Sequence, residues 1–170
     1  MTLADHKDAY SGRVFIMGTG PSLLLMSTQE RRVLGTEHTF AVSRYWKWAD
    51  GITPSFYLVA EQNHITDQSA LNARATIVRF MLNFQPAPDG WVALPKDEYV
   101  RTTISNGGLG KYPYVHQAQS ETLIALQVAV WLGFQQFYFL GNELTRQGEV
   151  YDIHEQRHSS LGNMRDDFEA

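Results

Sequence analysis

The sequence predicts an α/β fold with an open, mostly parallel, doubly wound sheet flanked by helices. Short apolar segments recur along the chain, and longer polar or helical stretches separate them. The first apolar segment ends in a glycine turn, and polar clusters directly follow four of the segments. Because right-handed crossovers bring the ends of parallel strands to one edge of a sheet, these clusters are expected to lie together.

The first expected strand covers residues 13–17 and ends in a glycine turn. That turn consists of Gly18, Thr19, Gly20, Pro21 and Ser22. A helix is expected to begin within this turn and to cover about residues 21–34. The turn differs from two phosphate motifs: Leu23 stands where the dinucleotide fingerprint has its third glycine, and the Gly-Lys-Ser/Thr end of a Walker A loop is missing. The alternative interpretation is a tight strand–helix turn that binds no ligand.

The residue types of the turn suit an anion. Glycine lets the backbone approach a ligand closely, and Pro21 fits the first helical position, where its missing N–H costs nothing. The amides of Gly20 and Ser22, the Ser22 hydroxyl and the helix dipole are then expected to face the anion.

The remaining expected strands are short apolar segments between Gly, Pro, Asp and other polar residues. They cover residues 39–42, 56–60, 76–80, 91–94 and 137–140. The last of them is expected to be buried. A short helix is expected over residues 66–74. A second, mostly apolar helix is expected over residues 121–132, with Ser120 as its N-cap and Gly133 at its end.

The length of 170 residues fits a single domain, 1–170. Residues 1–12 and about 148–170 are polar and are expected to form a flexible arm and a flexible tail. Residues 95–116 contain Asn106-Gly107-Gly108 and show no clear hydrophobic period. That composition is typical of a mobile loop, which makes this segment the candidate for a lid.

Composition excludes several classes of function. The chain has no cysteine, which excludes disulfides, thiolate catalysis and cysteine-based metal centres. The net charge of −4 and the lack of a basic stripe argue against nucleic-acid binding. Residues 1–12 lack the apolar core of a signal peptide, and no segment is apolar enough to span a membrane, so a cytoplasmic location is expected.

The polar clusters at the expected strand ends form the candidate site. Besides the glycine turn, they contain Ser43, Arg44, Glu61, Gln62, Gly141, Asn142 and Glu143. Each cluster alone is compatible with a solvated loop, whereas their convergence at one edge favours a binding site. Glu143 directly follows an expected strand and is suited to a ribose hydroxyl or a cation.

Two histidines near the C-terminal end are candidates for a general base. His154 and His158 are four positions apart, and imidazole titrates near neutral pH. No HExxH motif or third ligand accompanies them, so no metal site is predicted. The alternative for each is a surface histidine in a polar tail.

Three blocks of the chain resemble the bacterial sialyltransferases of the Campylobacter type and the related DUF115-like proteins. The turn with Leu23 resembles the Gly-Asn-Gly-Pro-Ser-Leu opening of that family, and residues 40–45 resemble its second-strand segment. Residues 132–141 match its Leu-Gly-Tyr…Ile-Tyr-Leu-Ser-Gly pattern, and Ser120 stands where a Thr-Ser-Gly segment starts a helix. The chain departs from the family at three places. Thr19 stands where the family has Asn, Ser43-Arg44 where it has Asn-Gln, and Glu143 where it has Asp.

The resemblance implies a Rossmann-like fold and a sugar transferase that uses a CMP-linked donor and needs no metal. Gly20 and Ser22 would contact the donor phosphate or ribose, and Ser43 and Arg44 the donor sugar or phosphate. Tyr151 would touch the leaving phosphate, and His154 or His158 would deprotonate the acceptor. The implied partners are a nucleotide sugar and a glycan or small-molecule acceptor, and a homo-oligomer stays open.

Two alternatives accompany this hypothesis. DUF115-like relatives include pterin pyrophosphokinases, which implies an enzyme using ATP and magnesium with Glu61 or Glu143 as carboxylates. The non-enzymatic alternative is a shortened accessory domain that keeps the nucleotide pocket without the acceptor half.

Overall fold

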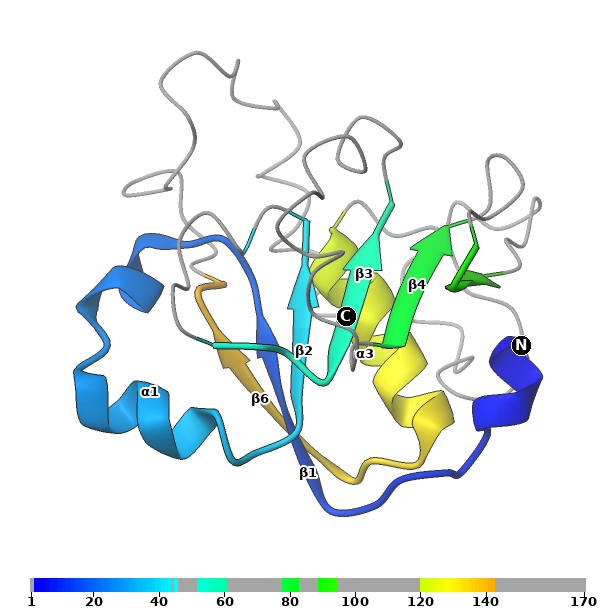
Figure 1. Cartoon of the computed structure of the whole chain (residues 1–170), viewed down its shortest axis with the longest axis horizontal. Coiled ribbons are helices and arrows are strands. Elements are labelled where there is room, and N and C mark those ends of the chain that lie inside the picture. The colour runs from blue at the N-terminus through cyan, green and yellow to red at the C-terminus, as the bar shows by residue number, and fades with distance from the viewer. Residues whose placement is uncertain are drawn as a thin grey trace, which may run out of the picture.

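The computed structural model describes residues 2–43, 45, 52–60, 78–82, 89–94 and 120–142. Within them lies a six-stranded, all-parallel sheet in the order β5-β4-β3-β2-β1-β6 (Figure 1). The strands are β1 (Arg13–Met17), β2 (Thr39–Val42), β3 (Phe56–Val59), β4 (Val78–Leu82), β5 (Trp91–Leu94) and β6 (Gln136–Leu140). The helices are the 3-10 turns η1 (Leu3–His6) and η2 (Pro21–Leu25), and α1 (Thr28–Leu34) and α3 (Glu121–Leu132). The predicted α/β class, a Rossmann-like doubly wound sheet, is confirmed.

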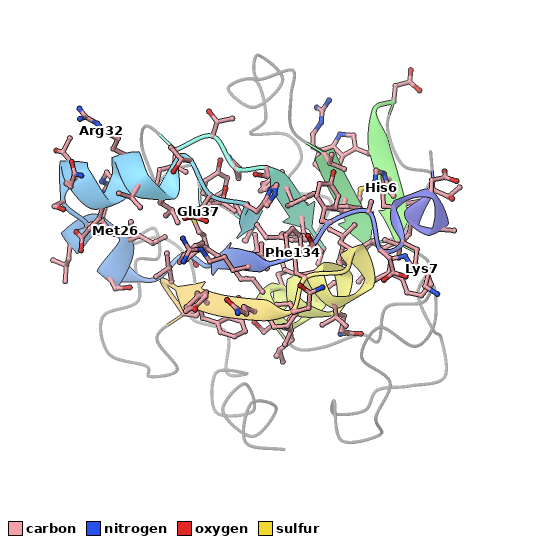
Figure 2. The ribbon with its side chains drawn as sticks, turned by 90° about the horizontal axis from the view of Figure 1, so that it is seen from below. His6, Lys7, Met26, Arg32, Glu37 and Phe134 are labelled. Atoms are coloured by element: carbon pink, nitrogen blue, oxygen red, sulfur yellow. The ribbon has the colours of Figure 1, made fainter. Side chains whose placement is uncertain are left out.

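Helices cover both faces of the sheet. One face packs against α3, where Ile16 of β1, Phe40 of β2 and Val128 of α3 share one core cluster. The opposite face holds a second cluster, in which Met17 meets Leu23 of η2 and Leu34 of α1. Figure 2 shows α1 and α3 on opposite sides of the strands. None of the helices in the described ranges has the length and apolar character to cross a bilayer.

The helix expected over residues 21–34 is divided into η2 and α1. The division occurs at Ser27, whose hydroxyl accepts from the Glu30 N–H at 3.2 Å, while the Glu30 carboxylate accepts from the Ser27 N–H at 2.6 Å. This capping box starts a new helix inside the expected one. The Arg31 guanidinium then joins the two pieces by donating to the carbonyls of Leu23 at 2.9 Å and Met26 at 3.2 Å.

The N-terminal residues 2–12 pack on the fold, which corrects the expectation of a loose arm. Leu3 is buried, and its carbonyl accepts from Trp131 Nε1 at 3.0 Å. The N–H groups of Asp8 and Tyr10 donate to the carbonyls of Trp131 and Leu132 at 3.0 and 2.9 Å. The segment is therefore hydrogen-bonded to the C-terminal end of α3, in the region where Figure 2 labels His6 and Lys7.

The last strand differs from its expected burial. β6 lies at the end of the described sheet, beside β1. Tyr138 is 45% exposed and Phe139 is 39% exposed, so the expectation of a buried strand is wrong. An apolar run indicates a strand, but it does not reveal whether that strand lies in the middle or at the end of a sheet.

Candidate functional site

The order of the strands creates a topological switch point between β1 and β6. The chain places β2 to β5 successively on one side of β1 and then returns through α3 to add β6 on the other side. In open α/β sheets, ligands bind outside the carboxyl ends of the strands at such a point. The glycine turn follows β1, and Gly141 and Asn142 follow β6, so the predicted placement of these two clusters at one edge is confirmed.

Hydrogen bonds join the two clusters directly. The Gly20 N–H donates to the Gly141 carbonyl at 2.7 Å, and the Gly141 N–H donates to Ser22 Oγ at 3.2 Å. The Gly18 N–H donates to the Leu140 carbonyl at 2.8 Å. The Gly20 amide therefore already donates its hydrogen bond within the protein, which corrects the expectation that it faces an anion. The expected dipole of a long helix is also missing, since η2 has five residues.

The side chain of Asn142 fills the space between the ends of β1 and β6. Its Nδ2 donates to the carbonyls of Ile16 at 3.1 Å and Leu140 at 2.9 Å, and its Oδ1 accepts from Thr122 Oγ1 at 2.6 Å. A Cβ on Gly18 would collide with this Oδ1. Gly18 is thus required by contacts inside the protein, where the sequence suggested only a close approach to a ligand.

Leu23 occupies the place that the dinucleotide fingerprint gives to a glycine. It is buried, and its Cγ lies 2.6 Å from where a Cβ on Gly141 would stand. Gly141 also has a φ of +65°, a conformation that favours glycine. The turn and the end of β6 therefore pack through a leucine against a glycine, and this geometry differs from that of a dinucleotide-binding turn.

The first turn of α3 contacts this edge at two places. The Glu121 carboxylate accepts from the Ala60 N–H, just after β3, at 2.7 Å, and Thr122 donates to Asn142 after β6. Ser120 is buried and accepts from the Thr122 N–H at 3.2 Å, as expected of the N-cap. Sequence reasoning assigned no role to Thr122. Its only signal was a polar residue near the start of a helix that is otherwise mostly apolar.

On the other side of β1, Ser43 follows β2 and has a φ of +51°. Its N–H donates to the Leu58 carbonyl at 3.0 Å, which extends the pairing of β2 with β3. The register Met17↔Ala41 places the ends of β1 and β2 next to each other. Ser43 therefore lies at the same edge as the glycine turn, as predicted.

Several predicted site residues lie outside the described residues. They are Arg44, Glu61, Gln62, Glu143, Tyr151, His154 and His158, together with the candidate lid over residues 95–116 and the tail from about residue 148. Their roles stay predictions. The roles of Thr19, Pro21 and Ser22 toward a ligand also stay predictions. All three residues lie in the turn that begins at the switch point.

The described edge is rich in hydroxyl and amide groups. They belong to Thr19, Ser22, Ser43, Thr122 and Asn142. Side-chain hydroxyls and amides can donate to and accept from the hydroxyls of a ribose or another sugar. The Thr122 hydroxyl and the Asn142 amide, however, already bond each other and the carbonyls of Ile16 and Leu140. Within the described ranges, no group of three or more His, Cys, Asp or Glu side chains is arranged to hold a metal ion.

Comparison with known proteins supports the fold. No protein-family model and no curated protein sequence matches the chain. Among solved structures, the fold is similar to that of the MAf glycosyltransferase from Magnetospirillum magneticum AMB-1, with a TM-score of 0.54 and 17% sequence identity. The similarity covers 92% of this chain, which spans only 29% of that protein. The chain thus shares the fold of one part of that longer protein.

Proposed function

We propose that this chain is the donor-binding unit of a glycosyltransferase and that it holds a CMP-linked sugar at the β1/β6 switch point. The observation that carries the proposal is the strand order, which brings the glycine turn and the Gly141–Asn142 corner together where open α/β sheets bind ligands. The similarity to a protein named as a glycosyltransferase supports the same class of reaction.

The amides of Gly18 and Gly20 donate within the protein, which favours a donor with a single phosphate. A pyrophosphate in a dinucleotide-binding turn uses glycine backbone and the N-terminus of a long helix. Here the N–H groups of Gly18 and Gly20 donate within the protein, and the helix after the turn is short. The side chains of Thr19 and Ser22 are proposed to face the ribose, and Arg44 is proposed to supply the positive charge for one phosphate.

The proposed reaction is a direct displacement. The acceptor hydroxyl oxygen attacks the anomeric carbon of the donor sugar, and the bond from that carbon to the phosphate oxygen breaks. The acceptor proton passes to the imidazole of His154 or His158, and CMP leaves with the bonding electron pair. The Tyr151 hydroxyl donates a hydrogen bond to the phosphate as its negative charge increases.

A thermal-shift panel with CMP, CDP, UDP, GDP and ATP, each with and without magnesium, tests the donor assignment. We expect CMP to raise the melting temperature without magnesium, because a ligand at 100 times its Kd stabilises the folded state by about 2.7 kcal/mol. Stabilisation by ATP only with magnesium would instead indicate the pyrophosphokinase alternative. No shift with any nucleotide would contradict the proposal.

Arg44→Ala tests the phosphate contact. Loss of a charge-assisted hydrogen bond is expected to weaken CMP binding by about 1.5–3 kcal/mol in calorimetry. Arg32→Ala is the matched control, because Arg32 is exposed on α1 and away from the switch point. Equal affinities of the two variants would remove Arg44 from the site.

A further inference from the structure

Ser43 has an unusual backbone conformation at the edge of the site. Among the described non-glycine residues, only Asp8 and Ser43 have a positive φ, at 53° and 51°. Asp reaches this left-handed region several-fold more often than most residues do. Serine lacks that preference, and it follows β2 next to the glycine turn. Backbone strain of this kind persists only where surrounding contacts hold it, and it is concentrated at functional sites.

A buried tyrosine holds Ser43 in this conformation. The hydroxyl of Tyr57, in the middle of β3, donates to the Ser43 carbonyl. The Ser43 N–H donates to the Leu58 carbonyl at 3.0 Å. Tyr57 is fully buried, with ring centroids 5.7 Å from Tyr45 and 6.1 Å from Trp91. Packing therefore fixes the hydroxyl, and both backbone groups of Ser43 are hydrogen-bonded to β3.

Pairing of the strands alone does not require this contact. β2 and β3 are already joined by the registered pairs Phe40↔Phe56, Ala41↔Tyr57 and Val42↔Leu58. A phenylalanine at position 57 would fill the same core volume without a buried hydroxyl that needs a partner. What the hydroxyl adds is a second hydrogen bond from β3 to the backbone of Ser43.

We propose that Tyr57 is a positioning residue of the nucleotide-sugar site and acts through the Ser43 carbonyl. By holding the left-handed turn, it fixes where Ser43 meets the donor. The inference rests on the proposed function for its ligand, but the hydrogen bond itself has a separate readout. No charge or catalytic step is assigned to Tyr57.

The test compares Tyr57→Phe with wild type in two measurements. Calorimetry is expected to show CMP binding weaker by up to about tenfold, because binding must then hold the turn without the hydrogen bond from Tyr57. Amide hydrogen exchange is expected to speed up at Ser43 while Phe40 stays protected. Tyr10→Phe, the same chemical change at the opposite edge of the sheet, is expected to change neither quantity. Ser43→Gly adopts the turn without strain, so in that background Tyr57→Phe is expected to weaken binding by less.

The outcomes separate the two proposals. If wild type binds CMP and Tyr57→Phe binds it equally well, the positioning role is overturned while the proposed function stands. A lower melting temperature with unchanged affinity would likewise assign Tyr57 to stability alone. If wild type binds no nucleotide, the proposed function fails, and unchanged Ser43 exchange in Tyr57→Phe would show that the hydroxyl does not hold the turn either.

Discussion

The amino and carboxyl edges of the sheet are formed by different types of residue. At the amino edge, the residues before β1, β2 and β6 bring aromatic rings together with the first residue of β3. Tyr10 lies edge-on to Phe56 at 4.9 Å between centroids and stacks with Phe134 at 5.6 Å, and His38 meets Phe134 at 5.3 Å. Figure 2 looks onto this edge, with Phe134 labelled. At the carboxyl edge, glycines, hydroxyls and one amide are joined by hydrogen bonds.

The difference separates stability from recognition. Aromatic pairs bury a large apolar area, so the amino edge closes the core. The carboxyl edge instead takes its shape from small residues and directional bonds, which leaves polar groups at the surface where the switch point lies. We therefore expect substitutions at the amino edge to act mainly on folding, and those at the carboxyl edge to act on local geometry.

The largest effect is expected for Gly133→Ala at the amino edge. Gly133 has a φ of +103°, and a Cβ there would lie 2.5 Å from the Tyr10 carbonyl oxygen and 3.0 Å from the Asp8 Cα. Because both obstacles are backbone, no rotamer change relieves them. Urea unfolding is expected to show a loss of about 2–5 kcal/mol from strain and overpacking.

Gly35→Ala is the matched control for Gly133→Ala. Gly35 has a helical φ of −65°, and its nearest Cβ contacts are ordinary, at 3.4 Å. Its substitution is expected to be neutral or to stabilise by up to about 1 kcal/mol. Equal losses for both variants would mean that the N-terminal segment does not close this edge.

At the carboxyl edge, Gly141→Ala is expected to be partly rescued. Here the obstacle is the side chain of Leu23, with its Cγ 2.6 Å from the added Cβ. In the Leu23→Ala background the collision is removed, so Gly141→Ala should cost about 1–2 kcal/mol less than in wild type, a coupling typical of residues in contact. Additive free energies of unfolding in this double-mutant cycle would contradict the packing of the turn on β6.

The smallest effect is a pH dependence at the break between η2 and α1. Hydrogen bonds from the Ser27 hydroxyl and backbone N–H lower the pKa of Glu30. A lowered pKa in the folded state means that this stabilisation is present above the ordinary carboxylate pKa of about 4.3 and is lost as the pH falls through the folded value. Melting temperatures measured from pH 6 downward should therefore fall more steeply for wild type than for Glu30→Gln.

The comparison with Glu30→Gln is needed because other carboxylates titrate in the same range. The pKa of Glu37 is lowered by its hydrogen bond with Arg13, and that of Asp5 by hydrogen bonds from Thr2. Both remain in the variant, so only the difference between the two curves reports the capping box. Parallel curves would show that the capping box contributes nothing.

Local signals predicted most of the described elements. The bounds of β1, β2, β5 and α3 match the expectation, because each segment carries its own apolar pattern and its own caps or breakers. The Gly133 end of α3 is left-handed, as its residue type indicated. The break at Ser27 was missed because the Ser27–Glu30 capping box lies inside a run that also satisfies one helical period.

Contacts between distant residues could not be predicted. The polar composition of residues 1–12 concealed Leu3, whose carbonyl meets Trp131 across 128 positions. Grouping the strand-end residues needed only parallel strands, so the common edge of the glycine turn, Ser43 and Gly141 was predicted correctly. Predicting which backbone amides already donate within the protein required the position of β6. The hydrogen bond from the Gly141 N–H to Ser22 Oγ, for example, joins residues 119 positions apart.

The place of β6 beside β1 also has a kinetic consequence. A chain made from its N-terminal end presents β1 long before β6, whose first residue pairs with Arg13 at Gln136. Until residues 136–140 leave the ribosome, one edge of β1 has no strand to pair with, although Val14, Phe15 and Ile16 give it an apolar character. Closing so long a loop slows folding, and an unpaired apolar edge attracts other chains. Synthesis of β6 is therefore expected to lower the tendency of the nascent chain to aggregate through this edge of β1.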